Sequence, residues 1–155
     1  MAKKPEIDIQ AAHEYFSAEC FNHTWDYIGK PRRKKSEEDQ MLQLSLASLW
    51  HWTQRNDCTP TNLSVGYWQV ARVFALLRQA DNARRYAELS LDAAQTKGVE
   101  AFYRGYAYEA LARAEMVAGN EEEMEKHLIQ AHQIAALLPD PEEKKQLLHD
   151  LATIR

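Results

Sequence analysis

The sequence predicts an all-α fold of about seven helices that pack as antiparallel hairpins. Apolar residues recur every three or four positions along nearly all of the 155 residues, which is the spacing of one helix face. Helix-start and helix-stop signals separate these periodic stretches. The expected connections are only about 2–8 residues long, so consecutive helices should lie antiparallel. No stretch predicts a strand.

The first hairpin is expected over residues 7–57. Its first helix has an apolar face formed by Ile9, Ala12, Phe16, Cys20, His23 and Tyr27. Gly29 and Pro31 end that helix. Ser36 and Asp39 have the spacing of a capping box for the second helix. The buried stripe of this second helix is expected at Leu42, Leu46, Leu49 and Thr53.

A second helix pair, a third pair and a short capping helix are expected at residues 60–97, 99–138 and 140–154. Thr59 is a typical N-cap, and Pro60 suits the first helical position. Gly98 ends the second pair, and Gly119 marks the turn of the third. Asp140 begins the last helix.

The chain repeats itself with a shift of 41 residues. The shift places Tyr67 on Tyr108 and Ala71 on Ala112. Further pairs are Val70 with Leu111, Arg72 with Arg113, Leu76 with Val117, Ala83 with Met124, and Ala94 with Ala135. Small residues therefore recur where two helices must approach closely, and one packing unit is expected to be used twice.

An aromatic residue, a Leu or Val and a small residue on a first helix, followed by a small residue on a second, resemble the tetratricopeptide pattern over residues 60–138. The resemblance implies one domain over residues 1–155 in which the hairpins stack as a short right-handed superhelix, with 7–57 as a degenerate first pair. The 41-residue spacing exceeds the usual ~34, and Glu115 stands where an aromatic residue is expected. More loosely, the stretches from Asn22 to Trp25 and from His51 to Gln54 resemble a group of small uncharacterised bacterial proteins of this kind.

Composition and charge argue against several classes of protein. A net charge of −4 argues against an obligate nucleic-acid partner, and no apolar run is long enough for a membrane span. Two cysteines do not make a disulfide framework, and no apolar segment follows the first residues, so a cytoplasmic protein is expected.

The sequence contains no glycine-rich phosphate loop, no CxxC pair and no HExxH motif, and we expect no enzyme, no cofactor and no metal. Cys20 lies on an apolar face, and the charge of Asp57 beside Cys58 disfavours a thiolate. In an antiparallel first hairpin, residues whose numbers sum to about 65 face each other. His51 then lies level with Glu14 and near His13, while His23 is too far along the helix to share an ion with it.

Five basic residues, Lys30, Arg32, Arg33, Lys34 and Lys35, form a cluster that we interpret as a solvated turn. No aromatic residues interleave with them, and acidic residues follow at once. Their charges are expected to pair locally rather than to bind a polyanion.

The candidate partner-binding residues are Trp68, Arg72, Tyr106, Glu109, Arg113 and Met116. The resemblance implies that the first helix of each pair lines a concave groove. Arg72 and Arg113 are expected at equivalent places in that groove, where two guanidinium groups suit a partner carboxylate. The alternative interpretation is that Glu109 pairs with Arg113 at i,i+4 and that Arg72 stacks on Trp68.

We expect a protein–protein interaction module that binds a protein or peptide, with a homodimer as one possible assembly. The alternative is a small-molecule or metal-binding protein with a pocket near His51, Trp50 and Trp52.

Overall fold

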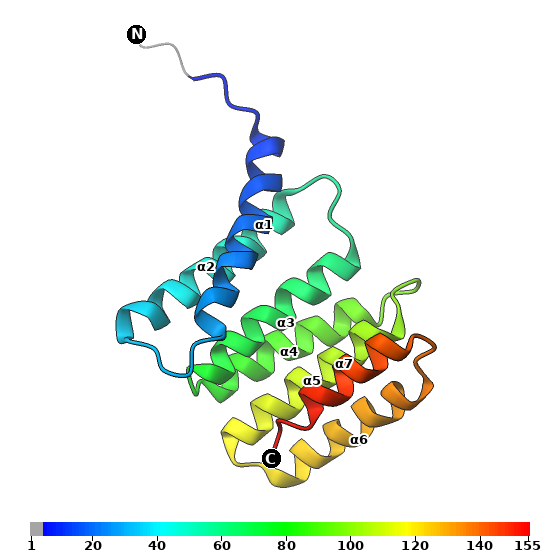
Figure 1. Ribbon diagram of the computed structural model, residues 1–155. Coiled ribbons are helices and arrows are strands. Elements are labelled where there is room, and N and C mark those ends of the chain that lie inside the picture. The colour runs from blue at the N-terminus through cyan, green and yellow to red at the C-terminus, as the bar shows by residue number, and fades with distance from the viewer. Residues whose placement is uncertain (1–4) are drawn as a thin grey trace. The chain divides into compact units, whose positions relative to one another are not determined.

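The computed structural model describes residues 5–155, which form helices joined by turns, with no strand among them (Figure 1). The seven helices are α1 (Ile9–Ile28), α2 (Lys35–Gln54), α3 (Pro60–Leu76), α4 (Ala80–Ala94), α5 (Ala101–Ala118), α6 (Glu121–Leu137) and α7 (Pro141–Leu151). The predicted all-α fold and the number of helices are confirmed.

The chain divides into two compact units, Met1–Cys58 and Thr59–Arg155. The N-terminal unit contains α1 and α2, and the C-terminal unit contains α3 to α7. The sequence predicts a single domain over residues 1–155 with a first helix pair at 7–57, and in the structure that pair lies within the first compact unit. The boundary between the two units, after Cys58, lies next to the predicted end of the first helix pair at residue 57.

Helices α1 and α2 pack against each other as an antiparallel hairpin with the expected register. The side chain of Gln10 donates to the carbonyl of Gln54 over 3.2 Å, and the Ser48 hydroxyl donates to the carbonyl of Ser17 over 2.7 Å. Both pairs of numbers sum to 64 or 65, as predicted. Ser17 and Ser48 are buried, so small side chains with satisfied hydroxyl groups line the contact between the two helices.

The apolar face predicted for the first helix is not the buried one. Ile9 is 58% exposed and Phe16 is 44% exposed, while Ser17 and Thr24 are fully buried. The Thr24 hydroxyl donates to the carbonyl of Cys20 over 2.7 Å, which removes most of the cost of burying it. The buried face of α1 is therefore rotated away from its most apolar side.

The second helix also differs from its prediction in detail. Lys34, rather than Ser36, is the residue at the N-cap, and its backbone N–H donates to the Glu37 carboxylate over 2.8 Å. Leu49 is buried as expected, whereas Thr53 is exposed. The capping signals of α3 and α7 are confirmed, since Thr59 and Asp140 both accept a backbone N–H of the following helix.

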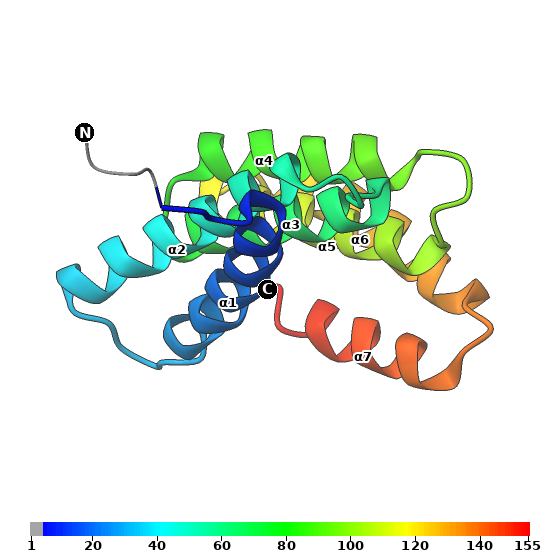
Figure 2. The ribbon, with the colours of Figure 1, turned by 90° about the horizontal axis from the view of Figure 1, so that it is seen from above.

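In the C-terminal unit α3 and α5 each pack against the next odd-numbered helix as well as against the partner helix of their own hairpin. Helix α3 contacts α4 and α5, and α5 contacts α6 and α7 in addition. Figure 2 shows α4 and α7 on opposite sides of α5. These packed pairs are compatible with a helical-repeat arrangement.

Small residues line the helix contacts of this unit, as the repeat predicts. Ala71 clusters with Ala87 and Ala110, and Ala112 clusters with Ala131, all buried. A β-carbon at Gly105, which the repeat did not single out, would lie 2.6 Å from Leu147 Cδ2, so α7 approaches α5 closely.

We expect Ala112→Leu to lower the free energy of unfolding by about 1–3 kcal/mol, because the larger side chain overpacks the contact between α5 and its neighbours. Leu favours helix almost as much as Ala, so propensity is not the cause. Urea denaturation measures the change, with the exposed Ala136→Leu as the matched control. Equal stabilities of the two variants would contradict the packing role.

Candidate functional site

A cavity of about 210 Å³ opens among α3, α5 and α7 of the C-terminal unit. Its lining is mainly aromatic and apolar, with Ser64 and Gln146 as polar members. We call it the aromatic pocket, and its lining residues are Ser64, Val65, Trp68, Phe102, Tyr103, Tyr106 and Gln146. Trp68 and Tyr106, two of the predicted site residues, are brought together here.

The rings of the aromatic pocket hold one another edge to face. The ring centroids of Trp68 and Tyr106 are 5.4 Å apart, and those of Phe102 and Tyr106 are 5.1 Å apart. Tyr103 packs against Phe102 with centroids 5.5 Å apart. Such arrangements are the favourable ones for aromatic pairs and fix the orientation of each ring.

The polar atoms of two of these rings are bound to carboxylates. The indole N–H of Trp68 donates to Glu109 Oε2 over 2.8 Å, and the Tyr106 hydroxyl donates to Asp150 Oδ2 over 2.6 Å. Burial and the neighbouring Asp150 carboxylate raise the pKa of Tyr106, so the phenol keeps its proton. Ring surface is therefore what these two residues can offer to a ligand.

Glu109 is the centre of a buried ionic network beside the pocket. Its side chain is 1% exposed, and Arg113 of the next helical turn donates to it. Arg72 of α3 also donates to it, with Nη1 3.3 Å from Oε1. Arg113 further donates to the carbonyl of Asp150 over 3.0 Å and to the Thr153 hydroxyl over 2.6 Å. The network thereby ties α5 to α3 and to the end of α7.

These contacts correct the predicted groove. Arg72 and Arg113 do occupy equivalent places and do converge, but they converge on the internal carboxylate of Glu109 instead of standing open to a partner. Arg113 and Glu109 are buried. The i,i+4 pair that the sequence offered as the alternative is the arrangement found. Burial and the charge of Arg113 lower the pKa of Arg72 from its ordinary value.

Met116, the remaining predicted residue, is not part of the aromatic pocket. It lines a separate cleft around the turn between α5 and α6, together with Glu115 and Asn120. Glu115, which replaces the expected aromatic residue, is buried and accepts two N–H groups of Arg84, with N–O distances of 2.5 and 3.1 Å. An ionic contact between α4 and α5 takes the place of an aromatic one.

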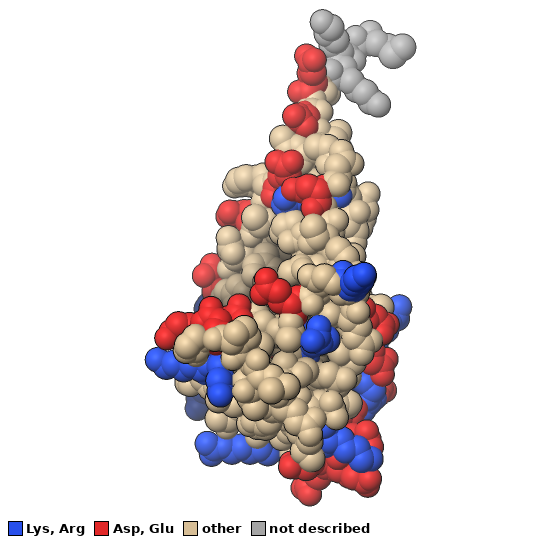
Figure 3. Space-filling view, turned by 90° about the vertical axis from the view of Figure 1, so that its right-hand side faces the viewer, with Lys and Arg blue, Asp and Glu red and all other residues tan. Residues whose placement is uncertain are grey.

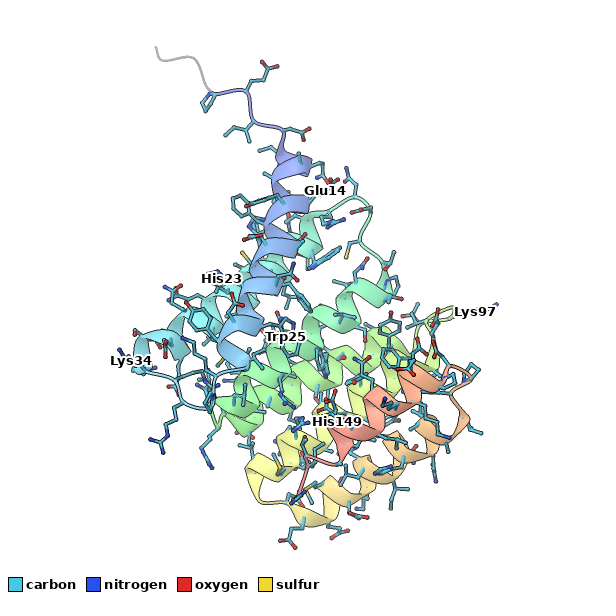
Figure 4. All side chains as sticks on the ribbon, in the orientation of Figure 1. Glu14, His23, Trp25, Lys34, Lys97 and His149 are labelled. Carbon is cyan, nitrogen blue, oxygen red and sulfur yellow. The ribbon has the colours of Figure 1, made fainter. Side chains whose placement is uncertain are left out.

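The histidines of the N-terminal unit form a pair, as the hairpin register allows. His13 Nδ1 and His51 Nδ1 are 2.8 Å apart, so one ring donates and the other accepts. His23 lies toward the opposite end of α1, near the turn (Figure 4). No group of three metal-ligating side chains occurs among residues 5–155. Two imidazoles are fewer than the three or four protein ligands that zinc takes.

The two tryptophans next to His51 point to different surroundings. Trp50 is 55% exposed and its ring centroid lies 4.9 Å from that of His51. Trp52 is half-buried, and the Arg55 guanidinium lies over its ring, with Arg55 Cζ 3.9 Å from the ring centroid. Among the described ring contacts, the His51 imidazole therefore contacts the indole of Trp50 but not that of Trp52. The predicted pocket around His51, Trp50 and Trp52 is not formed by these contacts.

Two of the five basic residues at the turn between α1 and α2, where Figure 4 labels Lys34, form local ion pairs, as predicted. Lys30 Nζ lies 2.5 Å from Glu37 Oε1, and Lys35 Nζ lies 2.6 Å from Asp39 Oδ1. Arg33 donates to the backbone carbonyls of Tyr27 and Lys30.

Cys20 and Cys58 form no disulfide, and burial raises the pKa of both thiols, which makes them poor nucleophiles.

Comparisons with family models, with curated proteins and with solved structures find no match for this chain. The tetratricopeptide resemblance stays a prediction that rests on the residues themselves. None of the helices among residues 5–155 combines the length and the apolar character that crossing a membrane requires.

We expect Glu109→Gln to lower the free energy of unfolding by about 3–5 kcal/mol, because it leaves the Arg113 and Arg72 charges without their anion in a buried site. Chemical denaturation measures the loss. The exposed Glu125→Gln is the control and should change stability by less than about 0.5 kcal/mol. A Glu109→Gln protein as stable as this control would show that the network contributes nothing.

We expect stability to fall on acidification because of the histidine pair. Burial and the neighbouring His13 lower the pKa of His51. As the pH falls, His51 is therefore protonated in the unfolded chain before it is protonated in the folded protein. The free energy of unfolding keeps its full value above about pH 6.5 and decreases as the pH falls through that value toward the lowered pKa.

Denaturation at pH 7.5 and pH 5.5 measures this decline in the wild type and in His51→Gln. Burial also lowers the pKa of His127, so part of the decline remains in the variant. The decrease in the free energy of unfolding should be smaller in the variant. An equal decrease in both proteins would show that the pair of His13 and His51 does not contribute to the pH dependence.

Proposed function

We propose that the C-terminal unit is a protein–protein interaction module that takes an apolar side chain of a partner segment into the aromatic pocket and has no catalytic activity of its own. The observation that carries this proposal is a preformed pocket lined mainly by aromatic rings, in which the Trp68 indole N–H and the Tyr106 phenol donate to Glu109 and Asp150. Apolar surface next to a few fixed polar groups is typical of binding sites.

The size of the pocket favours a side chain over a free small molecule. Its volume of about 210 Å³ lies below the ~300–1,000 Å³ that is usual for small-molecule sites. It is large enough for one bulky side chain such as Leu, Met or Phe. A partner segment would use it as an anchor point and find its remaining contacts on the surrounding surface.

A carboxylate on the partner, which the sequence predicts, contributes less to affinity in this proposal than an apolar side chain does. A partner carboxylate would have to compete with Glu109 for Arg72, whose side chain is 25% exposed. The apolar anchor is therefore the principal source of affinity. The proposal includes the tetratricopeptide-like character of this unit and a cytoplasmic location, both supported by the sequence features described above.

Selection of peptides from a random library on the purified protein tests this proposal. We expect the selected peptides to share one bulky apolar residue and to shift the NMR signal of the Trp68 indole N–H. Val65→Lys, at the pocket lining, should weaken binding at least tenfold, because it places a charge where the anchor is desolvated.

The matched control is Ile129→Lys on α6, where Ile129 is 46% exposed and outside the aromatic pocket. It should leave the affinity unchanged. Peptides that lack a common apolar position, or that bind both variants equally, would contradict the proposal.

A further inference from the structure

The N-terminal unit carries an exposed patch of aromatic and apolar side chains that its hairpin leaves uncovered. We call it the hairpin patch, and its members are Ile9, His13, Tyr15, Phe16, Trp50 and His51. Ile9, Tyr15, Phe16 and Trp50 are each between 44% and 60% exposed. Exposed apolar side chains that form one patch with polar residues at its edge are typical of an interaction surface.

Ring contacts join the members of the hairpin patch into one surface. The His51 ring lies 5.4 Å from Phe16 and 4.9 Å from Trp50, and Tyr15 lies 5.1 Å from Phe16, measured between centroids. Ile9 is seven residues before Phe16 and thus lies on the same face of α1. The surface is held in shape by its own rings and by the hydrogen bond between the two histidines.

Acidic residues predominate along α1, on one side of the hairpin patch, while Arg55, which follows α2, is paired with Asp57. Residues 5–28 contain five acidic residues and no Lys or Arg, while the whole chain has a net charge of only −4. Residues 43–54, the part of α2 that bears Trp50, contain no acidic residue and no Lys or Arg. In Figure 3 the acidic groups outnumber the basic ones toward the top, below the grey residues.

Two of these carboxylates border the patch directly. Glu19 lies three residues after Phe16 and four after Tyr15, which makes it their neighbour on the helix surface. Asp8, at the N-cap of α1, lies seven residues before Tyr15 and thus on the same side of the helix, and its carboxylate accepts the backbone N–H of Ala11. Neither carboxylate has an ion-pair partner among residues 5–155, whereas Lys30 and Lys35 at the turn are paired.

We propose that the hairpin patch docks a basic amphipathic segment of a partner protein. Apolar side chains of the segment would cover Phe16 and Trp50, and Lys or Arg beside them would pair with Asp8 and Glu19. Charge complementarity selects this occupant. A second copy of the chain would instead bring the same carboxylates against each other. The proposal concerns the N-terminal unit and is independent of the aromatic pocket.

Two synthetic helical peptides with the same Leu and Trp stripe test the proposal with the full-length protein. One has Lys beside the stripe and the other has Glu at the same positions. Titrations monitored by NMR should show that the Lys peptide binds and shifts the Trp50 indole signal, while the Glu peptide binds at least tenfold more weakly. Raising the salt concentration from 0.05 to 0.5 M should weaken the Lys peptide's binding.

Removing the two bordering charges should reduce affinity without unfolding the hairpin. Asp8→Asn keeps a good N-cap, so the double variant Asp8→Asn and Glu19→Gln retains α1. Two exposed ion pairs correspond to a roughly two- to thirtyfold loss of affinity. The matched charge control, Asp92→Asn with Glu125→Gln, alters two exposed carboxylates on α4 and α6 and should bind as the wild type does.

The apolar contribution has its own matched pair. Trp50→Ala should abolish most of the binding, whereas Leu137→Ala, at a position that is 85% exposed on α6, should not change it. Equal affinity for the Lys and Glu peptides, or equal effects of test and control variants, would overturn the proposal. So would a wild-type dimer in sedimentation that Trp50→Ala converts to a monomer, because the occupant would then be a second copy.

Discussion

Glu109 carries a carboxylate almost wholly removed from water, and two arginines and one indole N–H converge on it. The arrangement fixes three helices at once. The indole belongs to Trp68 of α3, and Arg113 reaches the end of α7 through Asp150. An isolated charge at such a place would be very costly, so the donors around Glu109 are a condition of its burial. The aromatic pocket owes its shape to the same contacts, since Trp68 is one of its walls.

The two units solve the problem of helix packing differently. In the C-terminal unit alanines allow close approach and apolar clusters fill the space, so the apolar sides of its helices are largely buried. In the N-terminal unit Ser17 and Ser48 bring α1 and α2 together through a hydrogen bond to a backbone carbonyl. A contact that uses serine does not consume the apolar stripe, which explains why Phe16 and Trp50 remain at the surface.

The elements and their order could be predicted because their signals are local. Thr59, Asp140 and Gly119 end or begin helices through their own backbone and side-chain geometry, and each acts as the sequence indicates. The hairpin register, which places His13 near His51, followed from an antiparallel turn alone. The two-unit division and the buried face of α1 could not be read in this way. Apolar periodicity identifies the more hydrophobic side of a helix, and serines that satisfy their hydroxyls internally give no such signal.

The candidate site shows the same division between what is local and what depends on neighbours. The 41-residue repeat correctly placed Arg72 and Arg113 at equivalent positions, but their availability depended on where Glu109 points. That carboxylate is itself at the repeat position of Trp68, so the two residues face each other across α3 and α5 as indole donor and carboxylate acceptor. Two arginines at equivalent positions without an anion would repel each other in a poorly hydrated contact. Equivalent arginines in a helical repeat thus indicate an exposed anion site only when no acidic residue occupies the matching position of the neighbouring helix. Here Glu109 occupies it, so the two arginines contribute to packing within the unit instead of forming an exposed anion site.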